Sequence, residues 1–186
     1  MRIIGGSRRG LKLAEVGGGD AAAHLRPTSD RVREAIFNLL INAHGNPVSG
    51  ARVLDLFAGT GALGLEALSR GALAATFVDD GAKALALLRA NIAKMRAEGE
   101  TQVIRQDARR LGANAASGYD LVFLDPPYGK GLGEVALTAV TQGGWLAPGA
   151  MVVWEEGAAP SVPEAFVLAD QRKYGDTIVT LLRAPE

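Results

Sequence analysis

The chain lacks several features, and each absence removes a class of structure or chemistry. It contains no cysteine in 186 residues, which excludes disulfides, zinc–thiolate sites and a cysteine nucleophile. No apolar run is long enough to cross a membrane and the N-terminus has no signal-peptide pattern, so we expect a cytoplasmic protein with no membrane partner. The two histidines, His24 and His44, have no second ligand near them in the sequence, so we expect no metal site.

The chain also has no net charge, since 20 basic residues balance 20 acidic ones, and this argues against indiscriminate binding to phosphate. The charges are unevenly distributed, however. Within residues 1–13 there are four basic residues and no acidic one: Arg2, Arg8, Arg9 and Lys12. A local basic patch can bind RNA, although an ordinary solvated surface explains the same pattern equally well.

The N-terminal segment, residues 1–45, is predicted to form a small extension. Residues 2–4 and 11–13 have the pattern of two short strands joined by a turn rich in glycine, serine and arginine. A helix is expected after Pro27, because apolar residues recur there at helical spacing behind three good N-caps: Thr28, Ser29 and Asp30.

From Ala51 onward, short apolar strands alternate with longer helices. Strands are expected at 52–56, 75–78, 103–104, 119–124 and 150–154, and helices at 61–70, 82–97 and 131–142. This alternation predicts an α/β fold whose parallel sheet is covered on both faces. Near the C-terminus, 165–169 and 177–182 flank a Gly-Asp turn and predict an antiparallel hairpin at one sheet edge. We expect a single domain, residues 1–186.

The first strand of this alternation leads into a glycine loop. Gly59, Gly61 and Gly64 match the dinucleotide-binding spacing G-x-G-x-x-G, with a strand before the loop and a helix after it. Asp79 follows Gly59 by 20 residues, where such proteins place an acid against ribose hydroxyls. An NAD-dependent oxidoreductase is therefore one hypothesis.

Asp55 favours a different ligand for the same loop. It lies four residues before Gly59, at the carboxyl end of the strand. A carboxylate in this position would repel a pyrophosphate. It would suit a cation instead, such as the ammonium group of a methionine moiety beside a sulfonium.

A second motif, Asp125-Pro126-Pro127-Tyr128, follows the strand at 119–124. Ligands of open parallel sheets bind beyond the carboxyl ends of the strands, so Asp125 would lie near the glycine loop if the two strands are neighbours. The prolines hold rigid carbonyl acceptors, and Tyr128 offers a flat face on which an extruded base could stack. Two acceptors, Asp125 and the carbonyl of Pro126, would orient an exocyclic amino group whose lone pair is otherwise delocalised into the ring.

Together these motifs resemble a known family. The glycine loop with its Asp55, combined with Asp-Pro-Pro-Tyr, is similar to class I S-adenosyl-L-methionine-dependent methyltransferases. Residues 2–13 and the string Leu-Arg-Pro-Thr-Ser-Asp-Arg-Val-Arg-Glu-Ala-Ile-Phe-Asn at 25–38 are more particular. They resemble the RsmD family, bacterial enzymes that methylate N2 of one guanine in 16S ribosomal RNA. The resemblance covers nearly the whole chain and implies a Rossmann-like, seven-stranded mixed sheet.

The resemblance also implies roles for individual residues. The cofactor would lie over the strand ends, with Asp79 at its ribose, and with Asp107 and the backbone N–H of Ala108 at its adenine. The cofactor-binding residues would then be Asp55, Phe57, Gly59, Gly61, Asp79, Asp107 and Ala108. The guanine would be held by Asp125, Pro126 and Tyr128.

The basic N-terminal hairpin and the helix after Pro27 would face the partner, 16S ribosomal RNA or the small ribosomal subunit. The residues implied in this contact are Arg2, Arg8, Arg9, Lys12, Arg26 and Arg31.

Several alternatives remain open from the sequence. Similar Pro-Pro-aromatic motifs serve amino groups of DNA bases and of protein glutamine, although 186 residues leave no room for a separate DNA-recognition domain. A non-catalytic RNA-binding module is disfavoured by the intact glycine loop and acceptor motif. Asp107 could simply cap a short helix, and arginines such as Arg33 could form surface ion pairs. Glu155 and Glu156 lie at the carboxyl end of the strand predicted at 150–154, where they could reach the cleft, but they are assigned no role.

Overall fold

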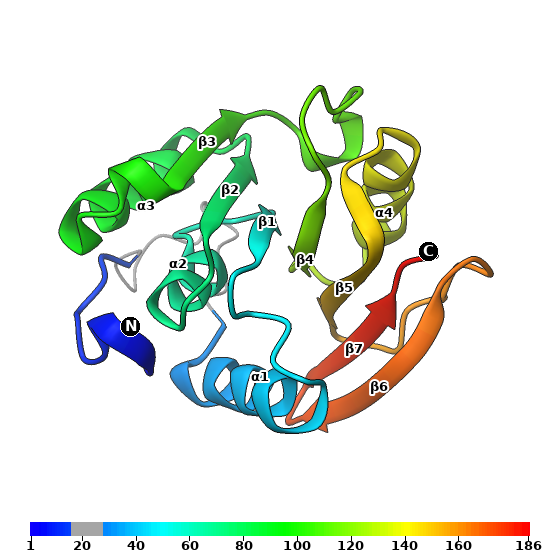
Figure 1. The fold of residues 1–186 in the computed structure, drawn as a ribbon, viewed down its shortest axis with the longest axis horizontal. Helices are drawn as coiled ribbons and strands as arrows, with labels where there is room; N and C mark the ends of the chain where they lie inside the picture. The colour runs from blue at the N-terminus through cyan, green and yellow to red at the C-terminus, as the bar shows by residue number, and fades with distance from the viewer. Residues whose placement is uncertain (16–27) are drawn as a thin grey trace.

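A computed structural model describes residues 1–15 and 28–186 of the chain. Its centre is a seven-stranded sheet in the order β3-β2-β1-β4-β5-β7-β6, in which β1 to β5 run parallel and β7 is antiparallel to both β5 and β6 (Figure 1). The strands are β1 (Arg52–Leu56), β2 (Ala74–Asp79), β3 (Thr101–Arg105), β4 (Tyr119–Leu124), β5 (Leu146–Glu156), β6 (Val167–Tyr174) and β7 (Thr177–Arg183). The alternation of strands and helices predicted the parallel part of this sheet, the C-terminal hairpin predicted its antiparallel edge, and the family resemblance implied seven strands in a mixed sheet; all three are confirmed.

Helices cover both faces of the sheet, as expected. The elements are α1 (Asp30–Ala43), α2 (Ala62–Ser69), α3 (Ala82–Met95) and α4 (Leu132–Gln142), with short 3-10 turns at η1 (Gly6–Arg8), η3 (Glu98–Glu100) and η4 (Ala108–Arg110). The first three helices share one core with Val53 and Phe123, whereas α4 shares the other with Leu54 and Val122. Adjacent strand residues therefore enter opposite cores, as the two-residue period of a strand requires.

The N-terminal segment pairs as a hairpin, but the prediction of two short strands is wrong. The structure has one antiparallel bridge, Arg2 to Lys12, and the 3-10 turn η1 between them. The backbone N–H groups of Ile4 and Gly5 do not continue a ladder, because each donates to a carboxylate oxygen of Glu66 at 2.8 Å. Backbone pairing is therefore confined to residues 1–3 and 10–13, where Ile3 donates to Leu11 and Leu13 donates to Met1, and docking onto α2 takes its place at Ile4 and Gly5.

Arg33 is buried, so the alternative that it forms a surface ion pair is wrong. Ser29 caps α1 by accepting a hydrogen bond from the N–H of Val32 at 3.2 Å, and one turn later Arg33 is completely buried. Its guanidinium is paired with Asp30 at 2.9 Å and with Glu66 at 3.5 Å. A buried arginine is tolerated only with such partners, so α1 and α2 are joined through a charged contact inside the core.

Glu66 is the centre of this contact. It is fully buried in α2 and accepts hydrogen bonds from the backbone N–H groups of Ile4 and Gly5. It also accepts one from Nε of Arg70 at 2.7 Å. Asn91 of α3 adds a second anchor, because its side chain bonds the backbone of Ala14 at 2.6 and 3.0 Å and the carbonyl of Thr60 at 3.0 Å. The N-terminal segment is thus fixed beside the glycine loop.

Among the helices of the described residues, none is long and apolar enough to span a bilayer.

Replacing Glu66 by Ala is expected to lower the free energy of unfolding by roughly 3–5 kcal/mol, because buried Arg33 would keep only Asp30 as a carboxylate partner and the N–H groups of Ile4 and Gly5 would lose their acceptor. Urea denaturation followed by circular dichroism measures this change. Glu98→Ala, at an exposed position of η3, is the matched control and should change stability little. A loss below about 1 kcal/mol for Glu66→Ala would show that Arg33 and the N-terminal backbone do not depend on this carboxylate.

Candidate active site

The glycine loop connects β1 to α2 through backbone conformations that favour glycine. Gly59 and Gly61 have φ angles of +56° and +80°, and Gly61 is the N-cap of α2. A Cβ on Gly61 would lie 2.4 Å from Cδ1 of Leu88. Phe57 also has a positive φ, +58°, which is strained for a side chain of this kind. Gly59 and Gly61 are both buried, so the loop turns from β1 into α2 through tightly packed backbone that leaves no room for a side chain at Gly61.

Asp55 lies beneath this loop and is nearly fully buried, with 2% of its surface exposed. It accepts a hydrogen bond from the N–H of Gly64 at 2.9 Å. Gly64 can approach this closely because it lacks a Cβ, which would lie 2.4 Å from the Phe77 ring. Burial raises the pKa of Asp55 well above its usual value, and the charges of Asp125 and Asp79 add to the increase. A cation beside Asp55 would therefore be strongly favoured.

Asp79, at the end of β2, ties the loop to the neighbouring strand. Its carboxylate accepts from the N–H of Gly59 and from the N–H of Gly81, each at 2.8 Å. Each oxygen keeps a further lone pair, so the carboxylate can still accept from a hydroxyl group. Its predicted place beside a ribose is compatible with this position at the strand end.

Asp107 and Ala108 follow β3, where the adenine contact was predicted. Asp107 caps the 3-10 turn η4 by accepting from the N–H of Arg109, and it forms an ion pair with the Arg109 guanidinium at 2.6 Å. The hydrogen bonds from Arg109 lower the pKa of Asp107. Ala108 is buried. The capping alternative describes the geometry of Asp107, and its contact with adenine stays a prediction.

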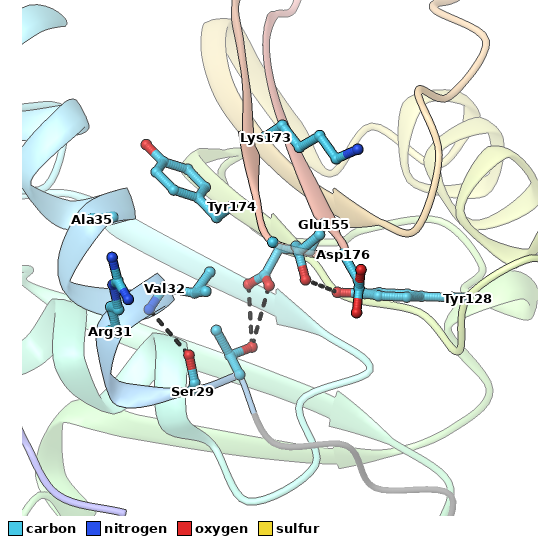
Figure 2. Close-up of a pocket in the computed structure, with 12 residues that line it drawn as sticks. Ser29, Arg31, Val32, Ala35, Tyr128, Glu155, Lys173, Tyr174 and Asp176 are labelled. Atoms are coloured by element: carbon cyan, nitrogen blue, oxygen red, sulfur yellow. Dashed lines mark hydrogen bonds between the residues drawn. The ribbon is translucent and has the colours of Figure 1, made fainter.

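The Asp-Pro-Pro-Tyr motif lies beside the glycine loop, so the expected proximity is confirmed. β1 and β4 pair in parallel with Leu56 opposite Leu124, and the motif begins at the next position with Asp125. Tyr128 turns toward the C-terminal hairpin, where its hydroxyl lies 3.1 Å from the hydroxyl of Thr177 (Figure 2). This contact orients the ring in the lining of a cavity.

That cavity measures about 710 Å³ and opens between the start of α1 and the turn joining β6 to β7. Arg31 and Lys173 lie at its border with their cationic ends pointing away from Glu155, and the rings of Tyr128 and Tyr174 stand on two sides of it (Figure 2). The volume exceeds that of a single base, so the cavity can hold a nucleotide. Its lining combines the two aromatic rings with charges of both signs, Arg31 and Lys173 against Glu155 and Asp176, and stacking on such rings is one way in which proteins hold unpaired bases.

Glu155 is the residue of this site that the sequence did not assign. It ends β5 with 1% of its surface exposed, and both of its carboxylate oxygens lie near the Thr28 hydroxyl, at 3.2 and 3.4 Å. The same hydroxyl lies 3.1 Å from Asp125. Burial, and then the charge of Asp125, raise the pKa of Glu155 well above its usual value. A sequence signal existed, because Glu155 has the same strand parity as the buried Val153.

The residues predicted to bind RNA fall into three groups. Arg2, Arg9 and Lys12 are exposed on the N-terminal segment, and Arg31 is exposed at the cavity. Arg8 instead binds within the protein, to the carbonyl of Met95 at 3.1 Å and to Glu100 at 2.7 Å. Arg26 lies outside the described residues.

The chemistry of this site suits a cationic cofactor better than a pyrophosphate. Four acidic residues gather at the ends of four strands beside the glycine loop: Asp55, Asp79, Asp125 and Glu155. Such a set would repel a dinucleotide phosphate and attract an ammonium or sulfonium group. In the described ranges, 1–15 and 28–186, no three potential ligands are arranged to hold a metal ion.

Comparison with known proteins agrees with this interpretation of the site. The family described as "Conserved hypothetical protein 95" matches residues 1–183. Ribosomal RNA small subunit methyltransferase D of Escherichia coli strain K12 is 38% identical over 185 residues, covering 97% of this chain and 88% of that protein. The enzyme of the same name from Haemophilus influenzae is 35% identical over 181 residues, covering 94% and 89%.

A solved structure extends the likeness to the fold. The Escherichia coli protein yhhF superposes with a TM-score of 0.84 at 37% identity, covering 100% of this chain and 98% of that one. The fold, the site and these relatives agree with the N-terminal motifs, and the chain belongs to the RsmD family of ribosomal RNA methyltransferases.

Proposed function

We propose that the protein transfers a methyl group from S-adenosyl-L-methionine to the exocyclic N2 amino group of a guanine in 16S ribosomal RNA. The observation that carries this proposal is the adjacency of Asp55 and Asp125 at the ends of paired strands. One carboxylate suits a cationic cofactor and the other an amino acceptor. The names of the relatives supply the class of RNA.

The cofactor would be held by the glycine loop and the acids around it. Phe57, Gly59 and Gly61 shape the loop, and the positive end of α2 faces the same space. Asp55 would face the ammonium group, and Asp79 the ribose hydroxyls. Asp107 and the backbone N–H of Ala108 would border the adenine. When bound, S-adenosyl-L-methionine supplies an electrophilic methyl group.

The acceptor would be held by the rigid turn after β4. Asp125 and the carbonyl of Pro126 would accept the two N–H bonds of the amino group, which aims its lone pair at the methyl carbon. Tyr128, fixed by Thr177, would stack on the base after it is turned out of the RNA. The gain in rate would come from positioning and from acceptors arranged in advance.

The exposed basic residues would guide the RNA. Arg2, Arg9 and Lys12 lie on the segment that Glu66 fixes against α2, and Arg31 lies at the mouth of the cavity. These positions suit contacts to phosphates along one side of the site. A ribosomal substrate, as free RNA or as the small subunit, places the reaction in the cytoplasm.

Mapping the modified nucleotide tests the whole proposal. Ribosomal RNA from a strain without this gene should lack one N2-methylguanine, and restoring the protein should return it. Purified protein should transfer labelled methyl groups to RNA or small subunits from that strain. Transfer to DNA or to protein instead would overturn the choice of acceptor.

Asp125→Ala is expected to reduce methyl transfer at least about 100-fold, because it removes an acceptor of the amino group. Binding of S-adenosylhomocysteine, measured by calorimetry, should change much less. Asp120→Asn is a matched control at the opposite end of β4, where Asp120 accepts from the N–H of Arg52 at 2.8 Å. Full activity of Asp125→Ala would end its assignment to catalysis.

Asp55 makes cofactor binding depend on pH. Its pKa is raised by burial, so acidification protonates it sooner than an ordinary aspartate and removes its attraction for a cation. Affinity for S-adenosyl-L-methionine should therefore weaken as the pH falls, and at a higher pH than an ordinary aspartate would require. Asp55→Asn should bind more weakly and lose most of this dependence. An equal pH dependence in both proteins, measured by calorimetry, would assign the titration to another group.

The exposed basic residues of the N-terminal segment should contribute to RNA binding. The pair of substitutions Arg9→Ala and Lys12→Ala should weaken RNA binding and flatten its dependence on salt by roughly 0.7 in logarithmic slope for each phosphate that is no longer neutralised. Fluorescence anisotropy over a salt series measures this slope. Arg183→Ala, exposed on β7 away from the N-terminal segment, is the control. An unchanged slope for the double variant would place the RNA elsewhere.

A further inference from the structure

Glu155 is a buried ionisable group that the proposed mechanism leaves unused. Its carboxylate points into the cavity from the end of β5 (Figure 2). Within the part of the chain that the structure describes, the Thr28 hydroxyl is the one donor of a hydrogen bond to it. That hydroxyl has a single hydrogen and also lies 3.1 Å from Asp125. A carboxylate that is so deeply buried normally accepts several hydrogen bonds, whereas Glu155 shares this single donor with Asp125.

The sheet register places Glu155 beside the acceptor motif. β4 and β5 run parallel with Leu124 opposite Trp154, so Asp125 and Glu155 both occupy the next position on their strands. Two residues earlier, Phe123 and Val153 enter the same core. Asp125 and Glu155 are therefore neighbouring acceptors on adjacent strands, and both lie against the Thr28 hydroxyl at the border of the cavity that Glu155 lines. Pro126 follows Asp125 directly in the sequence.

A guanine presents a matching row of donors. Its N1–H lies next to the N2 amino group on the same edge of the ring, so N1–H and one N–H of the amino group point in nearly the same direction, while the second amino N–H points toward the N3 side. Adenine and 2-aminopurine carry a lone pair at N1 instead. A carboxylate facing that lone pair would be repelled, and it would also stay buried without a donor.

We propose that Glu155 is a specificity-determining residue that accepts the N1–H of the target guanine, while Asp125 and Pro126 accept the hydrogens of N2. This inference rests on the proposed function and adds the reason why a guanine, and not another base with an amino group, is methylated. The N1–H would supply the donor that Thr28 alone cannot, which favours the ionised carboxylate that burial and Asp125 otherwise disfavour.

Base analogues separate recognition of N1 from recognition of the amino group. Ribosomal RNA can be assembled by ligation with guanine, 2-aminopurine or 6-thioguanine at the mapped position. All three carry the N2 amino group. 2-Aminopurine lacks N1–H and has no oxygen at C6, whereas 6-thioguanine keeps N1–H and alters only C6. The wild-type protein should prefer guanine to 2-aminopurine by about 100-fold in kcat/KM, and should accept 6-thioguanine within about tenfold of guanine.

Glu155→Gln should narrow the preference for guanine over 2-aminopurine by at least about tenfold, because a glutamine amide can donate to the N1 lone pair. The change should combine a gain with 2-aminopurine and a loss with guanine, because the amide oxygen accepts N1–H less strongly than a carboxylate does. Glu164→Gln, at an exposed position before β6, is the matched control and should leave the preference unchanged. Binding of S-adenosylhomocysteine and the thermal melting point report whether the Glu155 variant remains folded.

The possible outcomes are distinct. A Glu155→Gln protein that loses the same factor with both bases would make Glu155 a structural residue and overturn the inference. Equal use of guanine and 2-aminopurine by the wild-type protein would overturn it without any variant, while leaving the proposed function intact. Absence of methylation with the guanine RNA would instead overturn the proposed function itself.

Discussion

The constraint on which the site depends is the register of three parallel strands. β1, β4 and β5 end at the same edge of the sheet, so the buried Asp55 and Glu155 are brought close to the half-buried Asp125. Burial, and then the like charge of the neighbouring carboxylates, raise the pKa values of Asp55 and Glu155. The cost of ionising these carboxylates is relieved by ligands that carry positive charge or several N–H donors. A sulfonium cofactor and a guanine edge are such ligands.

A second set of buried charges serves the architecture rather than the chemistry. Arg33 and Glu66 join α1 to α2 inside the core, and Glu66 also receives the backbone of the N-terminal segment. Asn91 links that segment to the backbone of the glycine loop. The basic N-terminal surface and the cofactor loop are therefore parts of one packed unit, which places the proposed RNA contacts at a defined distance from the site.

Much of the molecule could be predicted because the relevant signals are local. The spacing of apolar residues, with a two-residue period in strands and a helical period in helices, predicted the alternation of elements. β1 and β4 have the expected bounds. Gly59 and Gly61 were identifiable because a tight strand-to-helix turn requires their positive φ angles. The prediction of short N-terminal strands failed because the contact that decides their structure is not local. Their N–H groups found an acceptor in Glu66, about sixty residues away in sequence, and no local pattern reports such a partner.

The amino-acid sequence by itself determined the class of fold, the glycine loop and the acceptor motif, because each is written in consecutive residues whose backbone preferences are intrinsic. Only the tertiary structure decided that Arg33 is buried and that Glu155 lies beside Asp125. Thr28 meets Glu155 across a separation of 127 residues, through the pairing of strands and the docking of α1. Whether a charged side chain is solvated or functional depends on what the folded chain places around it, and that environment is created by packing rather than by neighbouring residues.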